Sequence, residues 1–271
     1  MVELFEQDIR TNDRQSSKGN QLKWENNGIW YKADYLGYEG LAEYIISHLL
    51  CKSSLEKDEF VLYDLEEIKY KTTIYTGTKC DNFLHGGWQI ITLERLFKNF
   101  FNESLYKSIY VIESSSERLK FLVEQVERIT GLKNFGQYMN KLFTIDAFFL
   151  NEDRHTHNIA VLMNEKGDFA YCPIFDNGAG LLSDMQQDYP MTEESAELMK
   201  GVHAKTISSD FDEQLDISEN LYKSQIKFAF TEKDVTELLQ GASIYPVEAR
   251  NRVNEIICMQ IRKYKYLFET S

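Results

Sequence analysis

The stretch "FLNEDRHTHNIAVLMNEKGDFAYCPIFDNGAGLL", residues 149–182, contains two polar clusters that each follow an apolar run. The first cluster, "NEDRHTHN", comes directly after the apolar segment that ends at Leu150. The second, "DNG", comes directly after "CPIF". Burying a polar group without a hydrogen-bond partner costs free energy, so polar clusters at such boundaries need a reason. The stretch therefore indicates a functional site at the edge of a buried scaffold.

The segment between the two clusters, "NIAVLMNEKGDFAYCPIF", predicts a β-hairpin because alternating residues flank the turn sequence "NEKG". If Asn164 pairs with Gly167, Asn158 lies opposite Pro173. Asp176 follows that position by only three residues. At about 3.3 Å per residue, this spacing keeps Asp176 within reach of Asn158.

A third polar side chain, Asp153, stands five residues before Asn158 on the loop that leaves the apolar segment. Carboxylate and amide oxygens are the ligands that Mg²⁺ prefers. An Asp separated by four residues from an Asn, with an Asp-x-Gly downstream, is the spacing of the catalytic and metal-binding loops of protein kinases. In that pattern the first Asp orients and deprotonates the attacking hydroxyl, and the Asn and the second Asp hold the metal.

The N-terminal part of the chain predicts a small sheet with one helix. "QLKWENNGIWYKADY" indicates a hairpin over residues 21–34, because Asn-Asn-Gly suits a tight turn. Apolar residues at helical spacing predict a helix over residues 38–51. Two further stretches, "EFVLYDL" and "EIKYKTTIYTG", have the β-branched and aromatic density of strands.

The remainder is expected to be mainly helical. "SSERLKFLVEQVERITG" predicts a helix that closes at Gly131, and "FGQYMNKLFTIDAFFL" predicts a buried one. Further helices are expected over residues 218–230, 231–240 and 246–268, the last with Pro246 in its first turn. The fold class is therefore α+β, with a β-rich N-lobe over residues 1–80 and an α-helical C-lobe over residues 81–271.

Composition limits the class of protein. The chain has 271 residues, 43% of them hydrophobic, which is enough for a sizeable core. Its four cysteines are far apart and form no Cys-x-x-Cys pair, so we expect neither a zinc ribbon nor a disulfide framework. No signal-peptide pattern and no apolar run of about 20 residues is present, which argues against membrane insertion. The net charge of −13 argues against nucleic acid as the main partner.

Three motifs together resemble those of HipA-like serine/threonine kinases, and especially the short CtkA-like kinases. "NEDRHTHN", residues 151–158, matches every fixed position of their Asn-x-Asp-Arg-His-x-x-Asn catalytic loop. "PIFDNG" resembles their metal-binding segment, and "SSKGNQLK", residues 16–23, resembles the loop that covers the nucleotide phosphates. The motifs occur in the family's order over roughly residues 16–182, which makes the resemblance specific although each motif alone is weak.

This resemblance implies a protein-kinase-like two-lobe fold and an ATP- and Mg²⁺-dependent transfer of the γ-phosphoryl group to a serine or threonine of a protein substrate. Asp153 would be catalytic, and Asn158 and Asp176 would bind the metal. The same motifs supply three supporting residues: Arg154, His155 and Gly178. From the residues alone, Arg154 could equally pair with a buried carboxylate or contact phosphate, and His155 is expected to brace the loop.

The resemblance also assigns an ATP-binding set in the N-lobe. Lys32 would contact the α and β phosphates, and the carboxylate that holds it could be Glu39 or Glu43, which lie four apart on one helix face. Residues 75–82 would link the lobes and offer backbone groups to the adenine. The phosphate loop would use backbone N–H groups together with its own side chains, and its members are Ser16, Ser17, Lys18 and Gly19.

The resemblance further implies autophosphorylation at Ser16 or Ser17, which would repel the ATP phosphates and switch the enzyme off. The chain begins just before this loop, so we expect no N-terminal subdomain and infer no antitoxin partner. We expect a cytoplasmic bacterial protein, with secretion into a host as an open alternative. A phosphatidylinositol or other lipid kinase is a second interpretation, disfavoured by the short N-lobe and the lack of a basic membrane-facing run. A nucleotide-binding pseudokinase is a third, disfavoured by the intact Asp153, Asn158 and Asp176.

Overall fold

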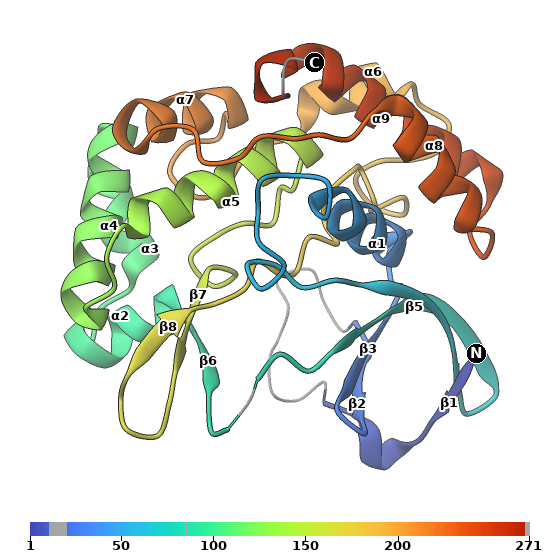
Figure 1. Ribbon diagram of the computed structural model, residues 1–271, viewed down its shortest axis with the longest axis horizontal. Coiled ribbons are helices and arrows are strands. Elements are labelled where there is room, and N and C mark those ends of the chain that lie inside the picture. The colour runs from blue at the N-terminus through green and yellow to red at the C-terminus, as the bar shows by residue number, and fades with distance from the viewer. Residues whose placement is uncertain (11–20, 85, 269–271) are drawn as a thin grey trace. The chain divides into compact units, whose positions relative to one another are not determined.

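The computed structural model describes residues 1–10, 21–84 and 86–268. The chain forms two compact units. The first unit comprises Met1–Phe83, Phe175–Val202 and Lys227–Ser271, and the second comprises Leu84–Ile174 and His203–Ile226. A β-rich N-terminal part and a largely helical C-terminal part give the α+β class predicted from the sequence (Figure 1). The lobe boundary near residue 80 stays a prediction.

The first unit contains a five-stranded sheet (Figure 1). Its strands, in spatial order, are β1 (Val2–Leu4), β4 (Asp64–Tyr70), β5 (Thr73–Asp81), β3 (Ile29–Ala33) and β2 (Lys23–Asn26). Only the β1–β4 pair is parallel. The hairpin predicted over residues 21–34 is confirmed as β2–β3. Its turn residues Asn27 and Gly28 have φ of 52° and 79°, the two positive values that a tight hairpin turn of this kind requires.

Of the two stretches with the residue density of strands, one is confirmed and the other was partly wrong. The stretch "EIKYKTTIYTG" lies in strands, with residues 67–70 in β4 and residues 73–77 in β5 and a turn at Lys71 between them. Lys71 has a φ of 55°, and no Gly or Asn marks this turn in the sequence. "EFVLYDL" lies mostly ahead of β4, where apolar side chains such as Phe60 and Val61 are buried from an irregular segment. Density of β-forming residues therefore indicated burial here rather than a strand.

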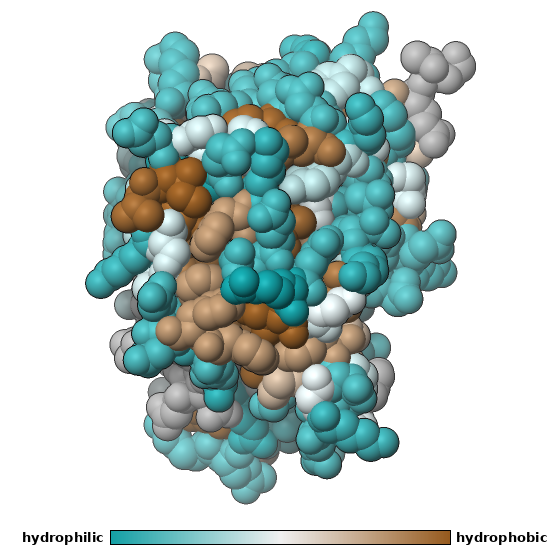
Figure 2. Space-filling model, turned by 90° about the vertical axis from the view of Figure 1, so that its left-hand side faces the viewer, coloured by the Kyte–Doolittle hydropathy of each residue, from teal (hydrophilic) through white to brown (hydrophobic). Residues whose placement is uncertain are grey.

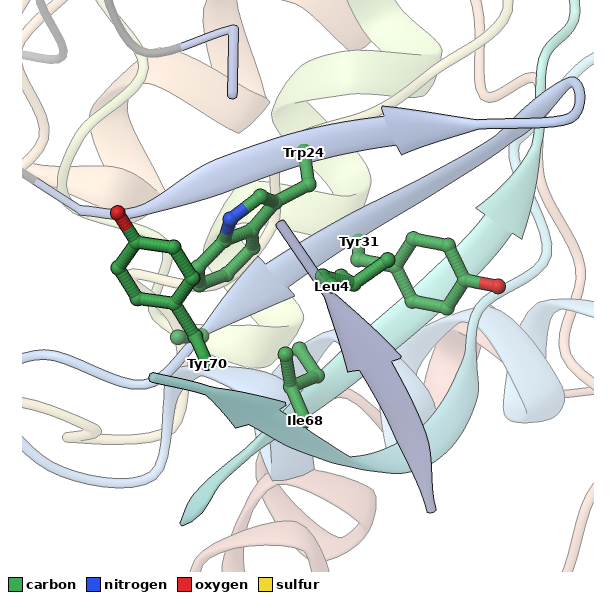
Figure 3. Close-up of a cluster of buried hydrophobic side chains, with 6 residues drawn as sticks. Leu4, Trp24, Tyr31, Ile68 and Tyr70 are labelled. Carbon is green, nitrogen blue, oxygen red and sulfur yellow. The ribbon is translucent and has the colours of Figure 1, made fainter. Parts of the chain in front are cut away.

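A cluster of buried side chains covers one face of the sheet (Figure 3). Trp24 and Tyr70 pack with their ring centroids 5.4 Å apart, and Leu4 and Ile68 complete the contact between neighbouring strands. Successive side chains of a strand point to opposite faces. Lys32, between Tyr31 and Ala33 of this cluster, therefore points to the other face.

Helix α1 (Glu39–Leu50) confirms the helix predicted over residues 38–51 and packs against β4 and β5. The other helices of the first unit are α6 (Ser195–Leu198), α8 (Glu232–Gly241) and α9 (Val247–Lys263). The prediction for α8 is confirmed. The last predicted helix was too long, since α9 ends at Lys263, and Pro246 is its N-cap rather than a first-turn residue. Short 3-10 turns lie at Glu6–Asp8, Met199–Gly201 and Lys265–Leu267.

The second unit combines helices with a small antiparallel sheet of order β6-β7-β8 (Figure 1). Its helices are α2 (Leu93–Phe101), α3 (Leu105–Tyr110), α4 (Ser115–Thr130), α5 (Phe135–Phe149) and α7 (Phe211–Tyr222). The predictions for α4, closed by Gly131, and for the buried α5 are confirmed. α5 packs against α4 and α7. Figure 2 shows the face that lies on the left of Figure 1, where apolar residues are gathered among hydrophilic ones.

The helix predicted over residues 218–230 was wrong in its position. The observed α7 begins after Asp210, whose side chain accepts the N–H of Glu213, and it ends at Tyr222, directly before Lys223, which has a φ of 67°. Beyond that point Ile226, Phe228 and Phe230 are buried while the residues between them are exposed. This two-residue period is typical of extended chain and not of a helix.

The hairpin after the catalytic-loop motif is confirmed, but its register differs by one residue from the prediction. β6 (Gln89–Thr92), β7 (Ala160–Met163) and β8 (Phe169–Tyr171) form the sheet, and Met163 pairs with Phe169. Asn164 consequently faces Asp168 instead of Gly167. The loop has three residues and Gly167 has a φ of 84°, which is the usual form of a three-residue hairpin.

Candidate active site

Lys32 of β3 lies between two carboxylates of the first unit. Its Nζ is 2.8 Å from Oε1 of Glu43 and 2.7 Å from Oδ1 of Asp176. The side chains of Lys32 and Glu43 are 14% and 3% exposed. Burial alone would lower the pKa of the Lys32 ammonium, but the charges of Asp176 and Glu43 raise it well above its ordinary value. Lys32 therefore keeps its positive charge at neutral pH.

The structure distinguishes the two glutamates that the sequence left open. Glu43 pairs with Lys32, and its second oxygen accepts the N–H of Asn177 at 3.0 Å. Glu39 instead turns back to the chain ahead of α1, where it accepts the N–H groups of residues 35–37 at 2.7 to 3.3 Å. A carboxylate in the first turn of a helix commonly satisfies such backbone donors. Glu39 thus fixes the start of α1, and Glu43 is the partner of the lysine.

The segment that carries Asp176 packs against α1. Asp176 has a φ of 61°, and a Cβ placed on Gly178 would lie 3.4 Å from side-chain carbons of both Glu39 and Glu43. Further along, the backbone oxygen of Ser183 accepts the N–H of Tyr38 at 3.1 Å. A Cβ on Gly37 would lie only 1.9 Å from the same oxygen of Ser183, so glycine is required there. These contacts hold Asp176 beside the lysine and the helix that carries Glu43.

The catalytic-loop motif forms a closed turn in the second unit. Nδ2 of Asn158 donates to the backbone oxygen of Asp153 at 2.8 Å and to Oδ2 of Asp153 at 2.9 Å. Nε2 of His155 is 3.6 Å from Oδ1 of Asp153, and the N–H of Asn158 donates to the oxygen of His155 at 2.7 Å. Burial lowers the pKa of His155, although Asp153 opposes this. His155 therefore spans the turn that brings Asp153 and Asn158 together.

Arg154 pairs with Asp146 of α5, and its Nη1 also donates to the backbone oxygen of Asn158 in this turn at 3.3 Å. Nε of Arg154 lies 3.2 and 3.1 Å from the two carboxylate oxygens. The side chains of Arg154 and Asp146 are only 2% and 0% exposed. Nδ2 of Asn151 also donates to Asp146, and Thr206 donates to the backbone oxygen of Arg154. Of the two roles open for Arg154, the structure shows pairing with a buried carboxylate.

Glu94, in the first turn of α2, is a supporting residue that the sequence did not indicate. Its Oε2 accepts the hydroxyl of Thr156 and the N–H of Tyr106, each at 2.9 Å. Its own N–H donates to the backbone oxygen of Thr156 at 3.0 Å. Burial raises the pKa of Glu94, but hydrogen bonds from Ser104, Tyr106 and Thr156 lower it below its ordinary value. The loop is thus held from α2 as well as from α5, by a contact between residues 62 positions apart.

Other predicted site residues have different outcomes. Ser16, Ser17, Lys18 and Gly19 lie outside the described residues. Residues 75–81 belong to β5, which is paired on one side with β3 and on the other with β4. Residues 77–79 pair on both sides and the others on one side only, so the role of residues 75–82 as a segment that links the lobes and offers backbone groups to adenine stays a prediction.

A metal site was predicted at Asn158 and Asp176, which belong to the second and first unit respectively. Within residues 1–10, 21–84 and 86–268, no three His, Cys, Asp or Glu side chains are grouped as a metal centre. The predicted pair contains an amide, so it is not a set of that kind, and its metal-binding role stays a prediction. In the same described parts of the chain, no helix has the length and apolar character needed to cross a membrane.

These elements form a kinase-like α+β fold, with a β-rich part and a helical part. Its arrangement resembles the crystal structure of a Helicobacter pylori proinflammatory kinase, CtkA, with a TM-score of 0.64. The match covers 98% of this chain and 96% of the other, at 12% sequence identity. No protein-family model matches the sequence, and no curated protein does. The likeness expected from the three motifs is thereby confirmed as a likeness of fold, and activity must be argued from the side chains.

Proposed function

We propose that the chain is an ATP- and Mg²⁺-dependent protein serine/threonine kinase. The observation that carries this proposal is the position of Lys32 between Glu43 and Asp176. A mostly buried ammonium that keeps its charge is suited to contact phosphate oxygens. A carboxylate on a neighbouring helix that holds the lysine in place is the arrangement that phosphoryl transfer in protein kinases requires.

The residues assigned to the metal fit a hard cation. Asp176 offers a carboxylate, and Asn158 offers its amide oxygen, since its amide nitrogen donates to Asp153. Oxygen ligands of these two kinds suit Mg²⁺. When bound, Mg²⁺ supplies positive charge beside the phosphate groups. The protein's own contribution is to orient these two side chains.

Asp153 is assigned to the acceptor hydroxyl. The hydroxyl oxygen attacks the γ-phosphorus and forms the new P–O bond, while the bond between that phosphorus and the β–γ bridging oxygen breaks and ADP leaves. The hydroxyl proton passes to the carboxylate of Asp153. Asn158 and His155 approach different oxygens of this carboxylate, and so they fix its orientation.

A protein acceptor is proposed over a lipid acceptor. The net charge of −13 disfavours adsorption to anionic lipid surfaces, which attract basic segments. The proposal includes autophosphorylation at Ser16 or Ser17, in the part of the chain outside the described residues.

Transfer of radiolabelled phosphate from Mg·ATP to peptide and lipid pools tests the proposal with the variant Asp153→Asn. We expect label in the peptide pool with the native protein and a loss of about 10²- to 10⁴-fold in the variant, with Mg·ATP binding retained. Asp168→Asn is the matched control, because Asp168 is an exposed aspartate of the hairpin turn in the same unit.

Each alternative outcome has its own meaning. Unchanged turnover in Asp153→Asn would remove Asp153 from the mechanism. Label in lipids alone would favour a lipid kinase, and no label with retained nucleotide binding would favour a pseudokinase. Mass spectrometry of the same native and variant samples checks Ser16 and Ser17 for phosphate, which is expected in the native protein only.

A further inference from the structure

The carboxylate of Asp34 joins four segments of the first unit. Asp34 follows β3 directly, and its Oδ1 accepts the N–H of Gly40 in the first turn of α1 at 2.6 Å. Its Oδ2 accepts the hydroxyl of Thr76 of β5 at 2.8 Å. The same oxygen accepts the hydroxyl of Tyr245, from the connection between α8 and α9, at 2.7 Å. One carboxylate thus connects the end of β3, which carries Lys32, with α1, which carries Glu43, and with β5 and Tyr245, which is 211 residues away in sequence.

The packing around this carboxylate is too close for any larger residue at two positions. A Cβ on Gly40 would lie 2.6 Å from the hydroxyl oxygen of Tyr245 and 2.9 Å from Oδ1 of Asp34. A Cβ on Gly77, in β5, would lie 2.0 Å from the backbone oxygen of Lys32. The start of α1 therefore packs closely against the end of β3 and the middle of β5.

These contacts determine where Glu43 lies relative to Lys32. Asp34 is two residues after Lys32 on the same chain segment, and Gly40 is three residues before Glu43, about one helical turn. The bond from Gly40 to Asp34 and the ion pair from Lys32 to Glu43 thus connect the same strand and helix at two neighbouring points. A shift of α1 at the first point would separate the charges at the second.

We propose that Asp34 and Tyr245 are positioning residues for Lys32, which fix α1 so that Glu43 meets the lysine ammonium. The inference rests on the proposed kinase function. Tyr245 acts through Asp34, because its hydroxyl donates to that carboxylate, and the hydroxyl oxygen lies 2.6 Å from the place that a Cβ on Gly40 would take.

The chemistry of the cluster makes its strength depend on pH. Gly40, Thr76 and Tyr245 all donate, so the ionised carboxylate suits them best, because a protonated one adds a hydrogen of its own among the three donors. Burial raises the pKa of Asp34 to about 6, the charge of Glu39 adds to this, and the hydrogen bonds from Tyr245, Gly40 and Thr76 oppose it. Among the residues that the structure describes, Tyr245 from the α8–α9 connection and Glu39 from α1 are the titratable groups that face Asp34. Protonation below pH 6 forces one of the donors to turn away and weakens the hold on α1.

The test combines an NMR titration with kinase kinetics over pH 5 to 8. The amide shift of Gly40 reports the ionisation of Asp34 directly and needs no enzyme activity. We expect a midpoint near pH 6 in the native protein, a higher midpoint in Tyr245→Phe because a stabilising donor is lost, and no such titration in Asp34→Asn. Tyr70→Phe is the matched control, because the Tyr70 hydroxyl also donates to a carboxylate of the first unit, that of Glu6.

The kinetic measurement tests whether the rate of phosphoryl transfer depends on the same ionisation of Asp34. The acid limb of kcat/KM for Mg·ATP should move upward in pH in Tyr245→Phe by the same amount as the NMR midpoint, while Tyr70→Phe keeps the native profile. Every reaction contains the same ATP, so any pH dependence of ATP itself is common to all variants. Only differences between the acid limbs of the variants are therefore interpreted. An active native enzyme whose acid limb is unchanged in Tyr245→Phe overturns the positioning role and leaves the kinase function standing. A native protein that transfers no phosphate overturns the kinase function and this inference with it.

Discussion

The buried pair between Arg154 and Asp146 gives the sharpest prediction about stability. Arg154→Met would leave the Asp146 carboxylate, which is 0% exposed in α5, with the amide of Asn151 as its remaining side-chain donor. Breaking a buried pair by removing one partner typically costs about 3 to 5 kcal/mol, because the other charge stays buried and uncompensated. We therefore expect the free energy of unfolding to fall by about this amount, measured by urea titration.

A double variant separates the value of the pair from the cost of an orphaned charge. In Asp146→Leu with Arg154→Met both charges are absent, so no uncompensated carboxylate remains. We expect this protein to recover most of the stability lost in the single variant. Lys120→Met on α4 is the control, since the pair of Lys120 with Glu117 is exposed and such pairs contribute about 0 to 1 kcal/mol.

The pH dependence of the single variant provides a second check. Burial raises the pKa of Asp146 in the native protein, and the charge of Arg154 opposes this rise. Removing Arg154 raises the pKa further. A carboxyl whose folded pKa exceeds its unfolded value contributes stability that is present below the unfolded pKa and lost as pH rises through the folded one. The deficit of Arg154→Met should therefore shrink between pH 7 and pH 4. A deficit that is the same at both pH values, or a double variant as unstable as the single one, would refute this reasoning.

Two further predictions concern the charges around the lysine. Glu43→Gln should lower phosphoryl transfer roughly ten- to hundredfold, because the lysine loses the group that orients it, whereas Glu39→Gln should have a much smaller effect in the same radiolabel assay. Asp176→Ala should abolish the binding of Mg·ATP in calorimetry yet improve the binding of ATP in the presence of a chelator. Equal effects of the two glutamate variants, or a loss of both forms of ATP binding, would contradict the respective assignment.

Elements with a strong local pattern could be predicted from the sequence. The hairpin at Asn27 and Gly28 and the helix end at Gly131 depend on backbone conformations that these residue types favour. The turn at Lys71 has a positive φ without such a residue, so its position followed from strand pairing alone. The helix predicted over residues 218–230 was wrong in its position. Beyond Lys223 every second residue is buried, which is the pattern of an extended segment, and the rest of the protein determines which of its residues are covered.

In the candidate site too, some features could be predicted from the sequence and others could not. The motif brought Asp153 and Asn158 to one turn, because five residues can close a loop by local hydrogen bonds. Sequence could not choose between Glu39 and Glu43, since two residues four apart share a helix face and only the packed chain shows which of them meets backbone donors. The supporting role of Glu94 was not predictable either, because its partner Thr156 is distant in sequence.

The prediction for Asp176 follows from the charges in the first unit. Lys32, Glu43 and Asp176 carry +1, −1 and −1, so together they present a net charge of −1 to an incoming nucleotide. The chain as a whole carries −13. Free ATP is itself strongly negative and is repelled by such a cluster, whereas a divalent cation reduces the charge of the nucleotide and gives Asp176 a second partner besides the lysine.

Removing the carboxylate of Asp176 brings the cluster to zero net charge and eliminates the proposed metal ligand. The loss of the metal ligand weakens the binding of Mg·ATP, whereas the loss of negative charge improves the binding of metal-free ATP. A variant that had merely lost its fold would lose both, so the opposite signs distinguish a metal ligand from a structural residue. The acidic character of the protein is thus compatible with nucleotide binding, provided that the metal arrives with the phosphate.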